Sequence, residues 1–400
     1  MNGAAQGSVA ALRELEGRYA MPTYPRAPVE FVRGEAARLW DTDGREYVDL
    51  FSGLSVHNAG NCHPRIVAAI SEQAATLGGT SNLFYSRPAM ELTERLVESS
   101  LGGRAFLCNS GAEANECAIK LVRRHSHGRG IDRPEIVVLD QAFHGRTLAA
   151  LAATPRLARE DLFGPLPAGF VPVPRDDPAA LSAAVGADTA AVMLEPIQGE
   201  SGVHPIADDV LIAARDACER TGALLVFDEI QTGMGRTGTL WAHQQGPVVP
   251  DVMTAAKALG GGLPVGACVT SPAVGEGLTL GEHGSTFAGG PICARAALAA
   301  LDVLADPAVL TNVGERETQL RHELDSHPAV AGIRGRGLMI GIALAAGIDA
   351  ATVNAEALAR GVVVNAPNPE TIRLLPPLTI DAADLGEGLA RLRGALAAAG

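Results

Sequence analysis

Short apolar runs alternate with stretches of helical periodicity through the middle of the chain. The apolar runs predict β-strands at 105–109, 135–140, 190–196, 223–229, 251–256 and 265–270. Residues 112–125 and 207–221 carry apolar side chains at helical spacing. Strands separated by helices predict an α/β fold, with a mostly parallel sheet covered by helices on both faces. Ligands of such sheets bind beyond the carboxyl ends of the strands.

The pattern changes from Pro291 onward. A long Ala/Leu helix begins there, and residues 335–344 and 362–366 read as strands between turn-rich breaks. This part predicts a smaller α+β domain. We expect residues 46–290 to form the large domain, residues 291–400 the small one, and residues 1–45 to join the small one.

Composition narrows the functional classes. Hydrophobic residues make up 47% and charged residues 19% of 400, which is typical of a globular protein. The net charge of −13 argues against a nucleic-acid surface. The chain contains no run of 18 apolar residues, so no membrane span is expected. Residues 1–20 show no secretory signal. Six scattered cysteines without a CxxC pair indicate free thiols in a reducing cytoplasm, and Cys62 beside His63 finds no second ligand pair for a metal.

Lysine is rare in this chain. Only Lys120 and Lys257 are lysine among 32 Lys and Arg residues, so the ammonium of Lys257 is expected to do something that a guanidinium cannot. A lysine can lose its proton and become a nucleophilic amine. Lys257 follows an apolar stretch and precedes three glycines, and desolvation there favours the free amine.

Residues 109–120, NSGAEANECAIK, predict an anion site. A strand, then Ser110-Gly111-Ala112, then a helix start leaves unpaired N–H groups at the helix N-terminus, where phosphate binds well. Gly111 is expected to let a ligand approach the backbone. An ordinary capped helix is the alternative interpretation. Lys120, four residues after Glu116, is expected to form a surface ion pair with it.

Four further side chains could serve a flat, charged ligand. Phe143 could stack on a ring, and Arg146 could bind a carboxylate in bidentate fashion. Asp228 ends an apolar strand at the ligand-binding edge, where a carboxylate needs a partner such as a protonated ring nitrogen. Thr286 offers another phosphate donor. The alternatives are a surface arginine and a helix-capping aspartate. Pyridoxal 5′-phosphate needs this combination: a Schiff-base lysine, a carboxylate, a phosphate cup and a stacking face.

At these residues the chain resembles the class III aminotransferases of pyridoxal-phosphate fold type I, and within them the acetylornithine-specific members. The resemblance runs from about Tyr24 to Pro377. Six motifs stand in family order: SNLFYS, FLCNSGAEANECAIKL, FHGRTLAAL, LEPIQGESGVHP, LLVFDEIQTGMGRTG and DVMTAAKALGGGLPVGA.

The resemblance implies a role for each matching residue. Lys257 is implied as the Schiff-base lysine that also moves the substrate proton, and Asp228 as the partner of the pyridine nitrogen. The implied cofactor contacts are Ser110, Gly111 and Ala112 on the phosphate, Phe143 on the ring, Gln231 on the phenolic oxygen, and Thr286 from the partner subunit of a homodimer with active sites at its interface. The implied substrate contacts are Arg146, Arg373 on the glutamate α-carboxylate, Glu200 masking Arg373, and Phe84 and Tyr85 in SNLFYS.

The implied reaction is a two-step transfer within arginine biosynthesis. The δ-amino group of N-acetylornithine passes to the cofactor and then to 2-oxoglutarate, giving N-acetylglutamate semialdehyde and glutamate. Succinylornithine, succinyldiaminopimelate, ornithine and 4-aminobutyrate stay open as alternative amine donors. The sequence has no GxGxxG motif at the first strand–helix turn, which argues against a nicotinamide dehydrogenase. It also has no GxSxG motif, which argues against a serine hydrolase. A non-catalytic relative is disfavoured because Lys257, Asp228 and Arg146 are all retained.

Two segments depart from the family pattern. Residues 54–64, LSVHNAGNCHP, lack the Asn expected near position 57 and the Leu-Gly-His expected near 59–61. Residues 286–294 carry Ala288 and Gly290-Pro291 where relatives usually have Gly and Asn-Pro. The first segment bears on substrate choice and the second on cofactor affinity.

Overall fold

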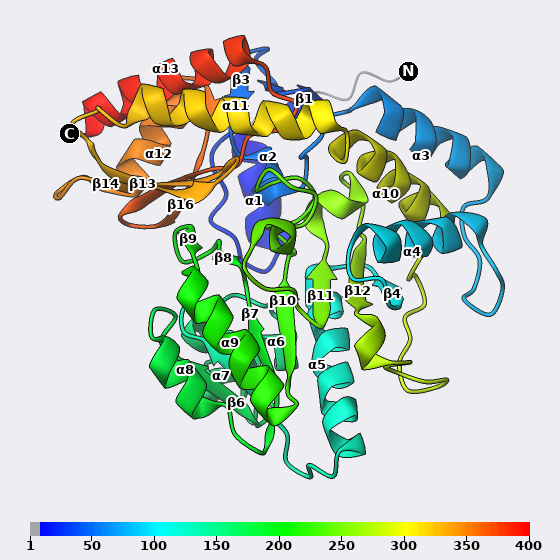
Figure 1. Ribbon diagram of the computed structural model, residues 1–400. Coiled ribbons are helices and arrows are strands. Elements are labelled where there is room, and N and C mark those ends of the chain that lie inside the picture. Colours follow the sequence, from blue (N-terminus) through cyan, green and yellow to red (C-terminus); the bar gives the residue numbers. More distant parts are fainter. Residues whose placement is uncertain (1–8) are drawn as a thin grey trace.

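The computed structural model describes residues 9–400, and a seven-stranded sheet forms the centre of its larger part (Figure 1). The strands follow the order β4-β12-β11-β10-β7-β5-β6. Their bounds are Ala105–Cys108 (β4), Glu135–Leu139 (β5), Phe170–Val173 (β6), Thr189–Leu194 (β7), Leu224–Asp228 (β10), Val252–Ala255 (β11) and Gly266–Thr270 (β12). All neighbouring pairs are parallel except those of β12, which runs antiparallel to both β11 and β4. The α/β fold with a mostly parallel sheet is therefore confirmed.

Helices cover both faces of this sheet. Alternate residues of β5 enter different clusters: Ile136 and Val138 pack with α5, whereas Val137 and Leu139 pack with α8 and α9. This alternation follows from the two-residue period of a strand and explains why the strands read as continuous apolar runs. The helices here are α5 (Gly111–Gly128), α6 (Leu148–Ala152), α7 (Glu160–Phe163), α8 (Pro178–Ala184) and α9 (Asp208–Thr221).

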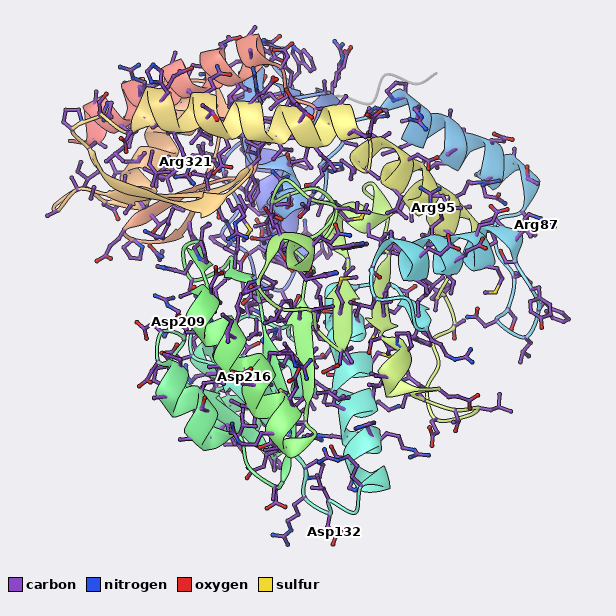
Figure 2. The ribbon with its side chains drawn as sticks, in the orientation of Figure 1. Arg87, Arg95, Asp132, Asp209, Asp216 and Arg321 are labelled. Atoms are coloured by element: carbon purple, nitrogen blue, oxygen red, sulfur yellow. The ribbon has the colours of Figure 1, made fainter. Side chains whose placement is uncertain are left out.

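Helix α9 shows why a predicted helix forms where it does. Two aspartates open its first turn and Gly222 ends it in the left-handed region, at φ 74°. Val210, Ala214 and Ala217 are buried on the sheet. Asp209 and Asp216 point away from the sheet into solvent (Figure 2). One face of the helix is thus apolar and the other charged.

The rest of the chain builds three smaller sheets and a second set of helices. The strands are β1 (Phe31–Glu35), β2 (Arg38–Asp41), β3 (Glu46–Asp49), β8 (Ile197–Gln198), β9 (His204–Pro205), β13 (Val330–Arg336), β14 (Met339–Leu344), β15 (Val362–Val363), β16 (Asn365–Asn368) and β17 (Thr371–Leu374). They pair in the orders β1-β2-β3-β15, β13-β14-β17-β16 and β8-β9. The helices are α1 (Val9–Tyr19), α2 (Ser52–Ser55), α3 (Pro64–Thr76), α4 (Arg87–Ser99), α10 (Pro291–Leu304), α11 (Pro307–Leu324), α12 (Ala350–Ala359) and α13 (Ala382–Ala399).

Strands near both ends of the chain share one sheet, because β3 pairs in parallel with β15. The domain boundaries expected after residues 45 and 290 stay a prediction. No helix within residues 9–400 has the length and apolar character needed to cross a membrane.

Two predicted strands are wrong in detail. Residues 335–344 are not one strand: β13 ends at Arg336, the chain turns at Gly337 and Leu338, and β14 returns antiparallel to it. Gly337 sits at φ 59°, and a Cβ there would lie 2.7 Å from the carbonyl oxygen of Arg236, so only glycine fits. Residues 362–366 likewise divide between β15 and β16, which belong to different sheets. In both places the run of apolar residues continues through a change in the direction of the chain.

Candidate active site

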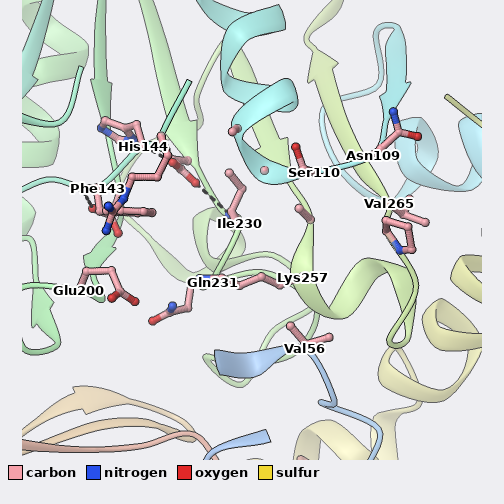
Figure 3. A pocket seen from close by; sticks show the side chains of 18 of the residues that line it. Val56, Asn109, Ser110, Phe143, His144, Glu200, Ile230, Gln231, Lys257 and Val265 are labelled. Atoms are coloured by element: carbon pink, nitrogen blue, oxygen red, sulfur yellow. Dashed lines mark hydrogen bonds and ion pairs between the residues drawn. The ribbon is translucent and has the colours of Figure 1, made fainter. Parts of the chain in front are cut away.

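A cavity of about 530 Å³ opens at the carboxyl ends of the parallel strands. Asp228 ends β10, Glu195 follows β7, Phe143 follows β5 and Lys257 follows β11, and all four line this cavity. Figure 3 shows Phe143 and His144 on one side, Ser110 on the other, and Lys257 with Gln231 between them. The volume lies in the range of roughly 300–1,000 Å³ that small-molecule and cofactor sites occupy.

Lys257 stands at the start of a 3₁₀ turn, Lys257–Gly260, with its backbone in the left-handed region at φ 46°. A non-glycine residue there is strained, and such strain gathers at functional sites. Its amine makes no hydrogen bond to another residue within 9–400. Burial lowers the pKa of Lys257, and this outweighs the attraction of Glu200. The expected shift toward the free amine is therefore present.

Asp228 is held by a buried network. Its Oδ2 pairs with Nδ1 of His144 at 2.8 Å and accepts a hydrogen bond from Nδ2 of Asn115 at 2.8 Å. Its Oδ1 accepts from the N–H of Ile230 at 3.1 Å. The hydroxyl of Thr254 donates to Oδ1 of Asn115 at 2.8 Å, which fixes the orientation of that amide. These contacts leave Asp228 ordered and still at the cavity wall.

His144 strengthens this network electrostatically. Burial alone would lower its pKa, but the hydrogen bond and the charge of Asp228 outweigh burial and raise it. The His144 imidazole and the Asp228 carboxylate therefore form a buried hydrogen-bonded pair. Sequence reasoning missed His144 and Asn115, although both lie in motifs that it singled out.

Glu195 is a second carboxylate that sequence reasoning missed. It accepts hydrogen bonds from the N–H of Phe143 at 2.9 Å and of Gly199 at 3.2 Å, so it connects two loops of the cavity. Burial, together with the nearby charge of Asp228, raises the pKa of Glu195 to about 7. The signal that identified Asp228, a carboxylate directly after an apolar strand, is present at Glu195 too.

The start of α5 presents an anion cradle to the same cavity. The side chain of Ser110 caps the helix by accepting from the N–H of Glu113 at 3.2 Å. The N–H groups of Gly111 and Ala112 have no hydrogen-bond partner within residues 9–400, and both residues line the cavity. The glycine has a packing reason as well, since a Cβ at Gly111 would lie 2.7 Å from Cδ1 of Ile230.

The expected ion pair between Glu116 and Lys120 is wrong. Lys120 donates to the carbonyl oxygen of Glu282 at 2.8 Å and contacts Nδ1 of His283 at 3.0 Å. Glu116 instead accepts from the N–H groups of Ala149 and Ala150 at the start of α6. Unpaired helix N–H groups outcompete a surface ion pair for this carboxylate.

Arg373 and Glu200 meet as the resemblance implies. Arg373 is buried, and its Nη1 donates to Oε1 of Glu200 at 2.7 Å. Asn365 accepts from the Nε and Nη2 of Arg373, at 3.1 and 2.7 Å. Glu200 lines the cavity and Arg373 does not, so the carboxylate stands in front of the guanidinium. Burial would raise the pKa of Glu200, but Arg373 and Lys257 outweigh burial and hold it at about 2.

Arg146 and Gln231 also line the cavity. The guanidinium of Arg146 is exposed and lies 5.6 Å from the centroid of the Phe143 ring. It forms no ion pair with a residue of the described chain, so it remains available to a carboxylate. Gln231 is buried, and its Oε1 lies 3.4 Å from Nη1 of Arg373.

Besides Arg373, three predicted site residues do not line this cavity. Thr286 is exposed elsewhere, and Phe84 and Tyr85 are 70% and 95% exposed. The two segments that carry them lie together, because Nδ2 of Asn82 donates to the carbonyl oxygens of Ser285 and Ala288. Within one chain these residues therefore form a surface.

Residues 52–55 have an unusual backbone conformation. The last two of them belong to residues 54–64, the first segment that departs from the family pattern. Ser52, Gly53, Leu54 and Ser55 all have φ between 49° and 66°, so α2 is a left-handed turn. Beyond it, Val56 lines the cavity and His57 lies against Gly262. A departure from the family pattern here thus changes the wall of the site itself.

The donor set of the cavity fits pyridoxal phosphate. A buried amine with a lowered pKa, a carboxylate held by hydrogen bonds, an arginine without an ion pair in the described chain and an aromatic ring all line the cavity. The two N–H groups at the start of α5 can bind an anion.

Comparison with known proteins identifies relatives along nearly the whole chain. The family described as "Aminotransferase class-III" matches residues 19–396. The chain is 47% identical to the acetylornithine aminotransferase of Xanthomonas campestris over 95% of its own length and 96% of the relative's. It is 43% identical to that of Methanocaldococcus jannaschii over 92% and 93%.

Solved structures agree with these relatives. The ornithine aminotransferase of Toxoplasma gondii superposes with a TM-score of 0.92 at 32% identity, covering 98% of this chain and 96% of that one. The N-acetylornithine aminotransferase of Stenotrophomonas maltophilia has a TM-score of 0.84 at 40% identity, with 96% and 98% covered. A second Toxoplasma gondii structure has pyridoxal phosphate in partial occupancy at its active site. The chain belongs to the class III aminotransferases, enzymes that depend on pyridoxal phosphate.

Proposed function

We propose that the enzyme transfers the δ-amino group of N-acetylornithine to 2-oxoglutarate, giving N-acetylglutamate semialdehyde and glutamate. One observation carries the proposal: the cavity has a free arginine, Arg146, and a second arginine, Arg373, behind Glu200. Such a site suits two substrates that differ by one carboxylate at the reacting carbon. Curated relatives at 43–47% identity, all acetylornithine aminotransferases, support the choice of amine donor.

We assign the cofactor contacts as follows. Asp228 would hold the pyridine nitrogen, Phe143 would contact the ring and Gln231 would hold the phenolic oxygen. Ser110, Gly111 and Ala112 hold the phosphate, with Thr286 coming from a partner subunit. When bound, pyridoxal phosphate supplies an electron sink for the carbon that bears the amine.

Lys257 performs the proton chemistry. Its Nζ, whose pKa is lowered by burial, takes the proton from the amine-bearing carbon of the donor and returns a proton to the acceptor in the reverse half-reaction. Asp228 does not move a proton. Its carboxylate oxygens are held in place by His144 and Asn115.

The two arginines position the substrates in turn. Arg146 binds the carboxylate distant from the reacting carbon, which both substrates carry. N-acetylornithine has no carboxylate at its reacting carbon, so Glu200 stays on Arg373 while it binds. 2-Oxoglutarate does have one there, and this carboxylate takes the place of Glu200 on Arg373.

We further propose a homodimer with its sites at the interface. Leu83, Phe84, Tyr85 and Phe287 are 70–95% exposed and lie on the two joined loops that also carry Thr286. An apolar group of this size on one surface is typical of an interface. A cytoplasmic location is proposed as well, supported by six free cysteines.

Ornithine is the second candidate donor, because the ornithine aminotransferase of Toxoplasma gondii superposes so well. The test measures glutamate formed from 2-oxoglutarate with each donor: N-acetylornithine, N-succinylornithine, succinyldiaminopimelate, ornithine and 4-aminobutyrate. We expect N-acetylornithine to give the highest kcat/KM. A higher value for any other donor would transfer the assignment to that donor and leave the family intact.

A further inference from the structure

A second cleft, of about 550 Å³, lies between the turn that joins β8 to β9 and the sheet that contains β13, β14 and β17. Figure 1 shows β8 and β9 beside this sheet. Three basic side chains line the cleft: Arg175, His204 and Arg334. Glu370 is the one carboxylate among its lining residues. None of these residues lines the active-site cavity.

The two arginines are held in place by neutral groups. Arg334 donates from Nε to the carbonyl oxygen of Gly202 and from Nη2 to Oγ1 of Thr371, both at 2.7 Å. Arg175 donates from Nη1 to Oε1 of Gln198 at 3.2 Å. Neither guanidinium forms an ion pair with a residue in the part of the chain that the structure describes. Each guanidinium is therefore fixed through some of its N–H groups, and its other N–H groups remain available to a ligand.

The charges of this cleft repel one another. Burial and then Arg175 lower the pKa of Arg334, in spite of Glu370. Burial, followed by Arg175 and Arg334, lowers the pKa of His204 to about 4, so its imidazole is neutral at pH 7. Two half-buried cations side by side need an anion to compensate them. The chain as a whole has a net charge of −13, so this local excess of positive charge is opposite in sign to the net charge of the molecule.

We propose that this cleft binds a small dianion such as phosphate, with Arg175 and Arg334 as its cationic contacts and His204 as a neutral hydrogen-bond donor. Guanidinium groups suit such an oxyanion because their N–H donors match its geometry. The site is separate from the cradle at Ser110, Gly111 and Ala112. It does not depend on the proposed reaction.

Isothermal titration with inorganic phosphate tests the proposal on the cofactor-loaded enzyme at constant ionic strength. Loading with pyridoxal phosphate keeps the cradle at the start of α5 filled, and its absorbance reports any loss. We expect saturable binding of one phosphate per chain. Arg175→Gln should weaken it about tenfold, since a charge-assisted contact is lost.

Two matched variants complete the design. Glu370→Gln removes the opposing carboxylate and should tighten binding about twofold. Arg393→Gln changes an exposed arginine of α13 outside the cleft and should leave binding unchanged. If Arg175→Gln does not fold, Glu370→Gln still tests the proposal, because its phosphate affinity should rise. Absence of saturable binding, or equal affinity in the wild type, Arg175→Gln and Glu370→Gln, would overturn the proposal.

Discussion

Asp228 and Glu195 show how the surroundings of a residue decide its chemistry. Both are buried carboxylates that follow an apolar strand at the same edge of the sheet. Asp228 has two side-chain donors, one of them His144, whereas Glu195 has two backbone N–H groups and a pKa raised to about 7. The first is thereby fixed at the cavity wall, and the second joins two loops.

Lys257, which we propose carries the chemistry, could be singled out in the sequence because lysine is rare in this chain. Only two lysines occur, and one of them stands after an apolar strand and before three glycines. Its supporting network could not be predicted. Asn115 lies on a helix and His144 in a loop, and nothing local in either segment indicates that both face Asp228.

Replacing Lys257 by alanine should abolish turnover. The amine that moves the substrate proton is lost, and such a group contributes at least about 10²–10⁴-fold to the rate. Steady-state glutamate formation is the measurement. Lys120→Ala, which removes the only other lysine, is the control and should retain activity; comparable rates in the two variants would refute the role of Lys257.

Replacing Glu200 by glutamine should alter substrate preference. Glu200 is ionised at neutral pH, with a pKa of about 2, and it occupies Arg373. Without its charge, Arg373 is open to the α-carboxylate of glutamate, so kcat/KM for glutamate as amine donor should rise about tenfold.

The half-reactions with glutamate and with N-acetylornithine provide the measurement for Glu200→Gln. The same substitution at Glu370, on the other side of the 199–204 turn, should leave their ratio unchanged. A ratio equal to that of the wild type in Glu200→Gln would show that Glu200 does not mask Arg373.

At the scale of elements, the left-handed turn of α2 depends on a buried arginine. Arg236 donates from Nε to Oγ of Ser55 at 2.9 Å and from Nη1 to the carbonyl oxygens of Leu338 and Pro376, at 2.8 and 2.6 Å. It also donates to Asn58, whose amide in turn donates to the carbonyl oxygen of Met234. Burial lowers the pKa of Arg236 to about 9. One side chain thus joins α2 to the β13–β14 turn.

Arg236→Met should therefore lower the free energy of unfolding by about 2–4 kcal/mol, since several buried acceptors lose their donor. Urea unfolding followed by circular dichroism measures it. Arg393→Met, at an exposed position of α13, should change the value by less than about 0.5 kcal/mol. Equal stability of the two variants would contradict the joining role of Arg236.

Helices and strands could be predicted from the sequence where the periodic pattern extends over many residues. They could not be predicted where the chain turns within an apolar run. Six strands of the large sheet and helices α5, α9 and α10 follow the predicted ranges closely, whereas the edge strand β6 was not predicted. The turn at Gly337 and the division of 362–366 depend on partners distant in sequence, such as Arg236 at one and β3 at the other.

At the scale of the whole molecule, the proposed homodimer would bring Phe84, Tyr85 and Thr286 to the active site of a second copy. Phe287 is 78% exposed beside them. Phe287→Asp should convert the proposed dimer to monomers at micromolar concentration, because a charge placed in an interface is costly.

Sedimentation velocity distinguishes the two states. Leu162→Asp, at an exposed apolar residue of α7, is the matched control and should leave the dimer intact. A wild-type chain that sediments as a monomer would contradict the shared site.

The central claim is that the amine donor is N-acetylornithine. The most direct test is an absorbance titration of the cofactor-loaded enzyme without any keto acid, with equal amounts of N-acetylornithine, ornithine and 4-aminobutyrate added separately. The account predicts that N-acetylornithine alone rapidly bleaches the visible band of the lysine-bound cofactor, and that 2-oxoglutarate restores it. If N-acetylornithine leaves the band unchanged while another amine bleaches it, the substrate assignment is contradicted, and residues 54–64 at the cavity wall become the first place to seek the reason.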